Sequence, residues 1–292
     1  MRAVQFICIG LSGSVSTIFS GSYVHFHMPG FSRPSSSAFF SATPVFRRDE
    51  FAAAFGRRTG DRAITDLLRY HLRAGNIRRI ARGVFAATSP GTDRFLAASR
   101  LRIGAVVAYR SALELHGHGP PSTGANEVQL ISPGEPGLVE TVDFACRFVS
   151  PPRHHLLGAG LTTVDRQGLP VSVTTLERTL ADVFDRYDLA GGALDLFRSL
   201  DVIVEGEAPL DIEALVDFAR QLNNASAAAA LGYWLDRERN RFGVKSAAVL
   251  DLHALAPRQP RYALGATPGH GLAATGWNVI LPAAVIERYY DD

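Results

Sequence analysis

The chain has 292 residues, of which 47% are hydrophobic and 20% charged, and its net charge at pH 7 is only +2. This composition excludes a disordered or collagen-like chain and favours a globular protein of two domains. The two cysteines, Cys8 and Cys146, are too few for a disulfide framework or a cysteine-rich zinc site. No apolar stretch reaches the roughly 18 residues that a membrane-spanning helix needs. We therefore expect a reduced, cytoplasmic setting and no membrane partner.

The charge is distributed unevenly along the chain. Between Arg47 and Arg82 there are ten arginines and four acidic residues, a net charge of +6 within 36 residues. Two further arginines precede this segment, so the 210 residues that follow it carry −6. A basic segment joined to an acidic body is the asymmetry expected of a DNA-binding module attached to a second function.

Residues 1–42 are expected to be mostly disordered, because much of this extension is rich in serine. A short apolar run at residues 4–11 follows Arg2, as in a signal peptide, but no A-x-A-like cleavage site comes after it. The alternative is a start at Met28, the only methionine after Met1, which would remove the apolar run and leave the rest intact.

Residues 43–90 have the pattern of a winged helix-turn-helix domain. A short apolar helix is expected to end at Gly56, a good C-terminal stop. A second helix is expected over residues 61–74, and apolar strands at 77–80 and 84–86 predict a β-hairpin around a glycine-containing turn. The second helix has apolar residues at spacings of three and four, which form one face: Ile64, Leu67, Leu68, His71 and Leu72.

The polar face of this second helix and the hairpin are expected to contact double-stranded DNA. A recognition helix places its N-terminal residues against base edges, where an arginine can donate two hydrogen bonds to guanine. The hairpin arginines would meet phosphates or the minor groove. The alternatives are that these arginines only solvate a helix face, or that the domain docks a protein. The predicted DNA-binding residues are Arg57, Arg58, Thr59, Arg62, Thr65, Arg69, Arg78, Arg79 and Arg82.

Four segments, in order, resemble AbiEi-type antitoxins. The first ends in A-R-G-V-F at residues 81–85. The second, VAYRSALELHG at residues 107–117, is similar to the family's SYxSALxLHG. The third, VTTLERTLAD at residues 173–182, is similar to V…PERTLLD, with Leu176 where proline is usual. The fourth, GWNVILP at residues 276–282, is similar to xWNLIVP.

The resemblance covers about residues 44–283 and implies two activities. The winged helix would bind operator DNA and repress the protein's own operon, and the C-terminal region would neutralise a nucleotidyltransferase toxin encoded beside it. Family members are not enzymes, so the resemblance implies no catalytic residue and no cofactor. The chain departs from the family pattern in its long N-terminal extension and in its single lysine, Lys245.

Residues 91–292 are expected to form a mixed α+β domain, which makes the whole chain an α+β protein with an N-terminal winged helix-turn-helix. Thr175 is expected to cap one of its helices, and Arg178 and Asp182 to form an i,i+4 pair. Helices are expected over residues 93–115, 174–187, 193–200, 212–222 and 225–240, and strands over 126–132, 141–149, 168–173 and 277–281.

Two histidine pairs could indicate a metal site. Neither His116 with His118 nor His154 with His155 has the further cysteine, histidine or carboxylate ligands that zinc needs. We therefore expect no metal, and we expect His116 to pack or hydrogen-bond at the C-terminal end of a helix.

Two alternatives to an antitoxin remain open. A metal-dependent nuclease could use Glu177, Asp182 and Asp185, although their spacing does not place them on one helical face. Ser111 lacks the G-x-S-x-G context of a hydrolase nucleophile. The other alternative is a transcriptional regulator whose C-terminal domain senses a ligand and which has no toxin partner.

Overall fold

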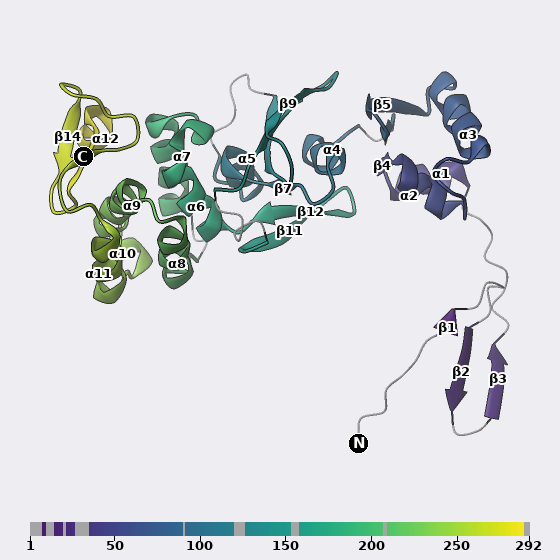
Figure 1. Ribbon diagram of the computed structural model, residues 1–292, viewed down its shortest axis with the longest axis horizontal. Coiled ribbons are helices and arrows are strands. Elements are labelled where there is room, and N and C mark those ends of the chain that lie inside the picture. The colour runs from purple at the N-terminus through teal and green to yellow at the C-terminus, as the bar shows by residue number, and fades with distance from the viewer. Residues whose placement is uncertain are drawn as a thin grey trace.

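The computed structural model describes residues 35–89, 91–119, 126–152, 158–206 and 209–288, together with the backbone of three short strands nearer the N-terminus. These strands pair antiparallel in the order β1-β2-β3 and span Cys8–Ile9, Val15–Phe19 and Ser22–Phe26. Residues 35–89 form a unit that we call the head, and residues 91–288 form the body. Within residues 35–288, the head lies at one end, the central sheet lies beside it, and helices with a small sheet follow (Figure 1).

The head is built from three helices and a three-stranded antiparallel sheet of order β4-β6-β5. The expected second helix and hairpin are present, and Ile64, Leu68 and His71 are buried as predicted. Gly83 adopts a positive φ of 78° in the turn between the hairpin strands, a conformation that favours glycine. The elements are α1 (Ser36–Ala42), β4 (Val45–Arg47), α2 (Arg48–Ala54), α3 (Arg62–Arg73), β5 (Ile77–Ala81) and β6 (Val84–Ala87).

Helix α1 lies within the extension that was expected to be disordered, so that expectation is wrong for residues 35–42. Ser35 caps the helix by accepting a hydrogen bond from the Ala38 backbone N–H at 3.2 Å. Phe39 and Phe40 are buried, and the Phe39 ring meets that of Phe51 at 5.2 Å between centroids. The helix is stabilised by this aromatic packing with α2 and β4, which a serine-rich segment does not reveal by itself.

The body contains a mixed six-stranded sheet of order β11-β12-β7-β8-β10-β9. Its strands are β7 (Val106–Val107), β8 (Glu127–Ile131), β9 (Gly137–Glu140), β10 (Ala145–Val149), β11 (Leu161–Arg166) and β12 (Leu169–Thr174). Strands β9 and β11 were not predicted. They form the two edges of the sheet and have mostly exposed side chains, so their sequences lack the apolar alternation of a half-buried strand.

The helical character expected over residues 93–115 is confirmed for two helices and wrong for the residues between them, where β7 lies. Helix α4 (Arg94–Leu101) ends before Gly104, which has a positive φ of 72°, and α5 (Tyr109–Leu115) begins after the strand. Val107 of β7 pairs with both β8 and β12. These long-range pairings decide the conformation of a segment whose local pattern is compatible with a helix.

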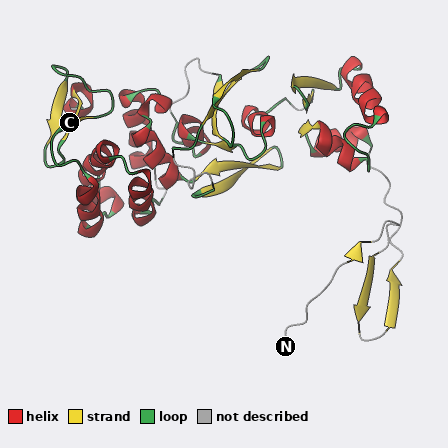
Figure 2. Cartoon of the chain, in the orientation of Figure 1, coloured by secondary structure: helices red, strands yellow, loops and turns green. Residues whose placement is uncertain are grey.

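Helices and a small sheet complete the body (Figure 2). The helices are α6 (Leu176–Asp185), the 3₁₀ helix η2 (Tyr187–Ala190), α7 (Ala193–Glu205), α8 (Ile212–Leu222), α9 (Ala225–Arg237), α10 (Arg239–Phe242), α11 (Ser246–Leu255) and α12 (Ala283–Glu287). The sheet, of order β13-β15-β14, contains β13 (Arg261–Tyr262), β14 (Gly271–Ala274) and β15 (Val279–Pro282). The last predicted strand therefore begins at Val279, and Trp277 lies in the turn before it. The mixed α+β character of the chain is confirmed.

The head and body share a packed boundary. Val45 and Val84 of the head belong to the same buried apolar cluster as Phe95 of α4. Glu50 in α2 pairs with Arg100 in α4 at 3.2 Å. Within the described residues, every helix is too short or too polar to span a lipid bilayer.

Candidate nucleic-acid interface

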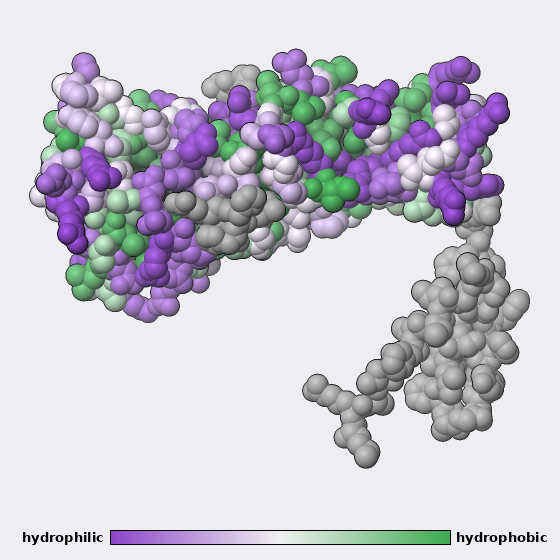
Figure 3. Space-filling view, viewed as in Figure 1, coloured by the Kyte–Doolittle hydropathy of each residue, from purple (hydrophilic) through white to green (hydrophobic). Residues whose placement is uncertain are grey.

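Helix α3 presents a charged, exposed face on the head. Asp61 caps the helix by accepting a hydrogen bond from the Ala63 backbone N–H at 2.9 Å. Arg62, Asp66, Arg69 and Arg73 recur along one side of the helix and are exposed. Asp66 lies between two of these arginines, 3.7 Å from Arg62 and 3.4 Å from Arg69. Strongly hydrophilic side chains project from this end of the molecule (Figure 3).

Arg48, at the start of α2, links the parts of this surface. Its backbone N–H donates to the Gly83 carbonyl in the hairpin turn at 2.9 Å. Its guanidinium donates to the Thr59 carbonyl at 2.8 Å and to the Thr65 hydroxyl at 2.5 Å. The hairpin turn, the α2–α3 turn and the first half of α3 therefore meet around one residue. The sequence counted Arg48 among the clustered arginines but did not assign it this role.

The predicted residues of the α2–α3 turn lie at the surface. Arg57 forms an ion pair with Asp61 at 3.3 Å and Thr59 is exposed. The side chain of Arg58 is exposed and has no hydrogen-bond or ion-pair partner among the described residues. Thr65 is different: it is half-buried, and its hydroxyl bonds to Arg48 and to the Asp61 carbonyl. Because its hydroxyl is engaged within the head, Thr65 helps to hold this surface in place and offers no free polar group to DNA.

The three hairpin arginines have separate surroundings. Arg82 is exposed in the turn, with no partner in the described part of the chain, and Arg79 donates to the Ala81 carbonyl at 3.1 Å. Arg78 instead reaches the body, where it pairs with Asp143 and donates to the Thr92 hydroxyl at 2.8 Å. The structure thus brings Arg82 to the surface around Arg48 and holds Arg78 against the body.

Two exposed residues of α3 were not predicted as contacts. Tyr70 has 62% of its surface exposed, and Arg73 lies on the same charged face as Arg69. The exposed face of α3 therefore continues one helical turn beyond the predicted residues. The spacing of three and four residues from Arg62 through Arg69 already placed Arg73 on this face in the sequence.

The carboxylates considered for a nuclease do not form one site. Glu177 accepts a hydrogen bond from the Asp211 backbone N–H at 3.2 Å, and Asp185 accepts one from Asn224 at 2.7 Å. Asp182 is fully buried against Arg178, with 2.8 Å between Nε and Oδ2. Burial raises the pKa of Asp182 to about 6, although Arg178 acts in the opposite direction.

The second histidine pair that was considered and rejected as a metal site, His154 and His155, lies outside the described residues. Among the residues that the structure describes, no group of three or more histidine, cysteine or carboxylate side chains could hold a metal ion. His116 lies at the C-terminal end of α5 and its Nε2 is 2.7 Å from the Thr174 carbonyl oxygen, as the expected hydrogen-bonding role requires.

The second, third and fourth segments of the family resemblance lie in the body, and the first lies in the β5–β6 hairpin of the head. The His116 contact with Thr174 joins the second segment to the third. Thr175 caps α6, and the Arg178–Asp182 pair forms as predicted. In the fourth segment, Trp277 is buried and stacks on His253 with 3.7 Å between ring centroids. These residues support the body, whereas the exposed arginines lie in the head.

No known family model matches the chain, and no curated protein is similar to it in sequence. Among solved structures, the chain is similar to the crystal structure of the RV2827C protein from Mycobacterium tuberculosis. The TM-score is 0.61 at 17% sequence identity, and the match covers 87% of this chain and 93% of that protein. At this identity the likeness concerns the fold alone, and it extends over both the head and the body.

Proposed function

We propose that this protein is a cytoplasmic, sequence-specific DNA-binding repressor that also serves as the antitoxin of a nucleotidyltransferase toxin. The observation that carries the DNA-binding half is the surface around Arg48. There the α2–α3 turn, the exposed face of α3 and the hairpin turn carry arginines that point to solvent.

The order of elements in the head supports a winged helix-turn-helix. Helices α2 and α3 are joined by a short turn, the β5–β6 hairpin follows, and β4 pairs with the hairpin to complete a sheet. In this motif the second helix enters the major groove. Helix α3 would then place Arg62, Asp66 and Arg69 toward base edges, and Arg82 would act as the wing contact.

The antitoxin half of the proposal is supported by the four segments that resemble AbiEi-type proteins. The second, third and fourth segments lie in the body, whereas the first lies in the head and contains Arg82 of the proposed DNA surface. If the head binds operator DNA, the body is available to neutralise the toxin. The carboxylates Glu177, Asp182 and Asp185 are engaged within the fold, so no specific observation favours the nuclease alternative.

The first test is a mobility-shift titration of the full chain against its own upstream DNA at two salt concentrations, with unrelated DNA as competitor. We expect specific binding that weakens as salt rises, because arginines displace counterions from phosphates. Arg62→Ala should cost about 1–3 kcal/mol and relax the specificity, as expected for a residue at a base edge. Arg82→Ala should weaken binding to all sequences and reduce the salt slope by about 1.

Arg198→Ala is the matched control, because Arg198 is an exposed arginine on α7 with 67% of its side chain accessible. It should leave DNA binding unchanged. Binding with no preference for the upstream DNA, or equal binding by the wild type and Arg62→Ala, would contradict the proposal. The antitoxin half is tested separately, by co-expression with the neighbouring toxin. We expect that a variant of the body can lose protection of the cells against the toxin while its DNA binding stays intact.

A further inference from the structure

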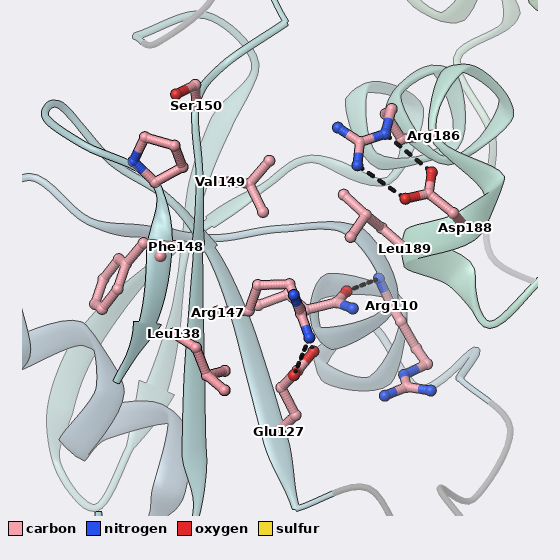
Figure 4. A pocket seen from close by; sticks show the side chains of 13 residues that line it. Arg110, Glu127, Leu138, Arg147, Phe148, Val149, Ser150, Arg186, Asp188 and Leu189 are labelled. Carbon is pink, nitrogen blue, oxygen red and sulfur yellow. Dashed lines mark hydrogen bonds and ion pairs between the residues drawn. The ribbon is translucent and has the colours of Figure 1, made fainter. Parts of the chain in front are cut away.

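A pocket of 550 Å³ opens on the body, and all of its lining residues belong to the body (Figure 4). It lies among the strands β8, β9 and β10, the start of α5, and the segment that joins α6 to η2. Three arginines from three different elements line it: Arg110 in α5, Arg147 in β10 and Arg186 before η2. Neither the predicted DNA contacts nor the residues of the nuclease alternative include any of them.

Two of these arginines are held in place by carboxylates. Arg147 donates two hydrogen bonds to Glu127 on the neighbouring strand, both of 2.9 Å. Arg186 donates to Asp188 in the same two-pronged way, at 2.9 and 2.8 Å. Each guanidinium has five N–H groups. Each therefore keeps further donors for a ligand while its orientation is fixed.

Two other donors in the pocket are left without partners. The guanidinium of Arg110 forms no hydrogen bond or ion pair with the described residues, although its backbone N–H donates to the side-chain oxygen of Gln129 at 3.1 Å. Gln129 is only 4% exposed, and its amide nitrogen meets no acceptor in the part of the chain that the structure describes. Gln129 lines the pocket, so an amide donor with no acceptor in the described fold is available to a ligand that enters it.

The charge and size of the pocket define the class of that acceptor. Three guanidinium groups face two carboxylates, which leaves the lining with a net positive charge. A guanidinium matches the geometry of a phosphate and binds it through two N–H groups. The volume lies within the range of about 300–1,000 Å³ that is usual for small-molecule sites. Leu138 on β9, with 49% of its surface exposed, offers an apolar wall for the organic part of a ligand.

We propose that this pocket binds a small phosphate ester of about the size of a mononucleotide, with Arg110 and Gln129 contacting the phosphate. Such a ligand supplies the acceptors that both side chains lack. The proposal does not rest on the proposed DNA-binding function. The proposed ligand site would give the body a means to sense a metabolite, in addition to DNA binding by the head.

Calorimetric titration of the full chain with adenosine 5′-monophosphate, with adenosine and inorganic phosphate as separate probes, tests the proposal. We expect the monophosphate to bind, adenosine to bind far more weakly, and Arg110→Ala to lower the affinity about 10- to 100-fold, as loss of a charged hydrogen bond implies. Glu127→Gln should act in the opposite direction and raise the affinity, because it removes a negative charge and frees the Arg147 guanidinium. A merely structural role of the pocket would not give changes of opposite sign.

Arg198→Ala serves again as the control for a lost arginine outside the pocket, and thermal unfolding of each variant reports whether it is folded. Three outcomes would overturn the proposal: equal affinity of Arg110→Ala and the wild type, equal binding of adenosine and its monophosphate, or no binding of either phosphate probe at millimolar concentration.

Discussion

At the residue scale, the buried pair of Arg178 and Asp182 is a point where a single change has a large effect. Both side chains are fully buried, and Arg178 also donates to the Ala159 carbonyl at 2.7 Å. Removing one member of a buried pair leaves the other charge in a medium of low polarity. Cys146 is a buried residue that stays neutral: burial keeps its thiol protonated and out of contact with solvent.

We predict that Asp182→Ala lowers the free energy of unfolding by about 3–5 kcal/mol, because the Arg178 charge loses its carboxylate. Asp195→Ala is the control, since Asp195 pairs with Arg198 at the surface and its loss should change stability by about 0.5 kcal/mol or less. Chemical denaturation measures both. If the two changes lowered the free energy of unfolding equally, the stabilising role of the buried Arg178–Asp182 pair would be contradicted.

Cys146 should be unreactive in the folded protein. Burial raises the pKa of its thiol to about 12, with Glu127 as a smaller contribution, and the side chain is fully buried. A thiol reagent needs the thiolate and access to it. In a Cys8→Ser background at pH 8, we therefore expect no labelling by a disulfide reagent until denaturant is added, and then labelling of one thiol. Rapid labelling of the native protein would contradict this burial.

At the element scale, close packing between α9 and the C-terminal sheet depends on Gly232. A Cβ atom at this position would lie 2.1 Å from the Trp277 ring, and the ring itself is fully buried between α9 and His253. The helix and the turn before β15 can approach this closely only without a side chain at residue 232. The fourth segment of the family resemblance thus marks a packing contact between elements.

We predict that Gly232→Ala lowers the free energy of unfolding by about 1–3 kcal/mol or more, despite the higher helix propensity of alanine, because the methyl group displaces the Trp277 ring. Gly60→Ala is the matched control. Gly60 has no heavy atom within 4 Å of its would-be Cβ and no positive φ. Tryptophan fluorescence during denaturation reports both variants. Stabilisation by Gly232→Ala would contradict the contact.

At the scale of the whole molecule, head and body are connected by packing and by a few polar contacts. Arg78 in the hairpin pairs with Asp143, which precedes β10, and β10 carries Arg147 of the pocket. Asp143 also accepts a hydrogen bond from Asn126, which precedes β8. The strands that line the pocket therefore begin beside the residues that hold the hairpin.

We predict that Asp143→Ala increases the salt dependence of DNA binding, with a slope change of up to about 0.9, because Arg78 is released to contact one more phosphate. Arg78→Ala, in contrast, should leave the slope of the wild type nearly unchanged. The two changes should be non-additive in unfolding measurements, with a coupling of about 0.5–1 kcal/mol. Strict additivity in a double-mutant cycle would show that the pair does not link head and body.

The sequence by itself determined the features that depend on neighbouring residues. Helix α3, the β5–β6 hairpin, the Thr175 cap and the Arg178–Asp182 pair follow from periodicity, glycine positions and i,i+4 spacing, which are local. It also located the arginine cluster and the mixed α+β character of the chain.

Only the tertiary structure decided the features that depend on contacts between distant segments. Helix α1 is stabilised by phenylalanines of α2 and β4, and β7 interrupts the expected helix because it pairs with β8 and β12. The same holds for Arg48, which joins three parts of the head, and for the pocket arginines, which come from three elements. Local pattern carries no information about which distant side chain completes a core or a site, because that is set by the long-range packing of the whole chain.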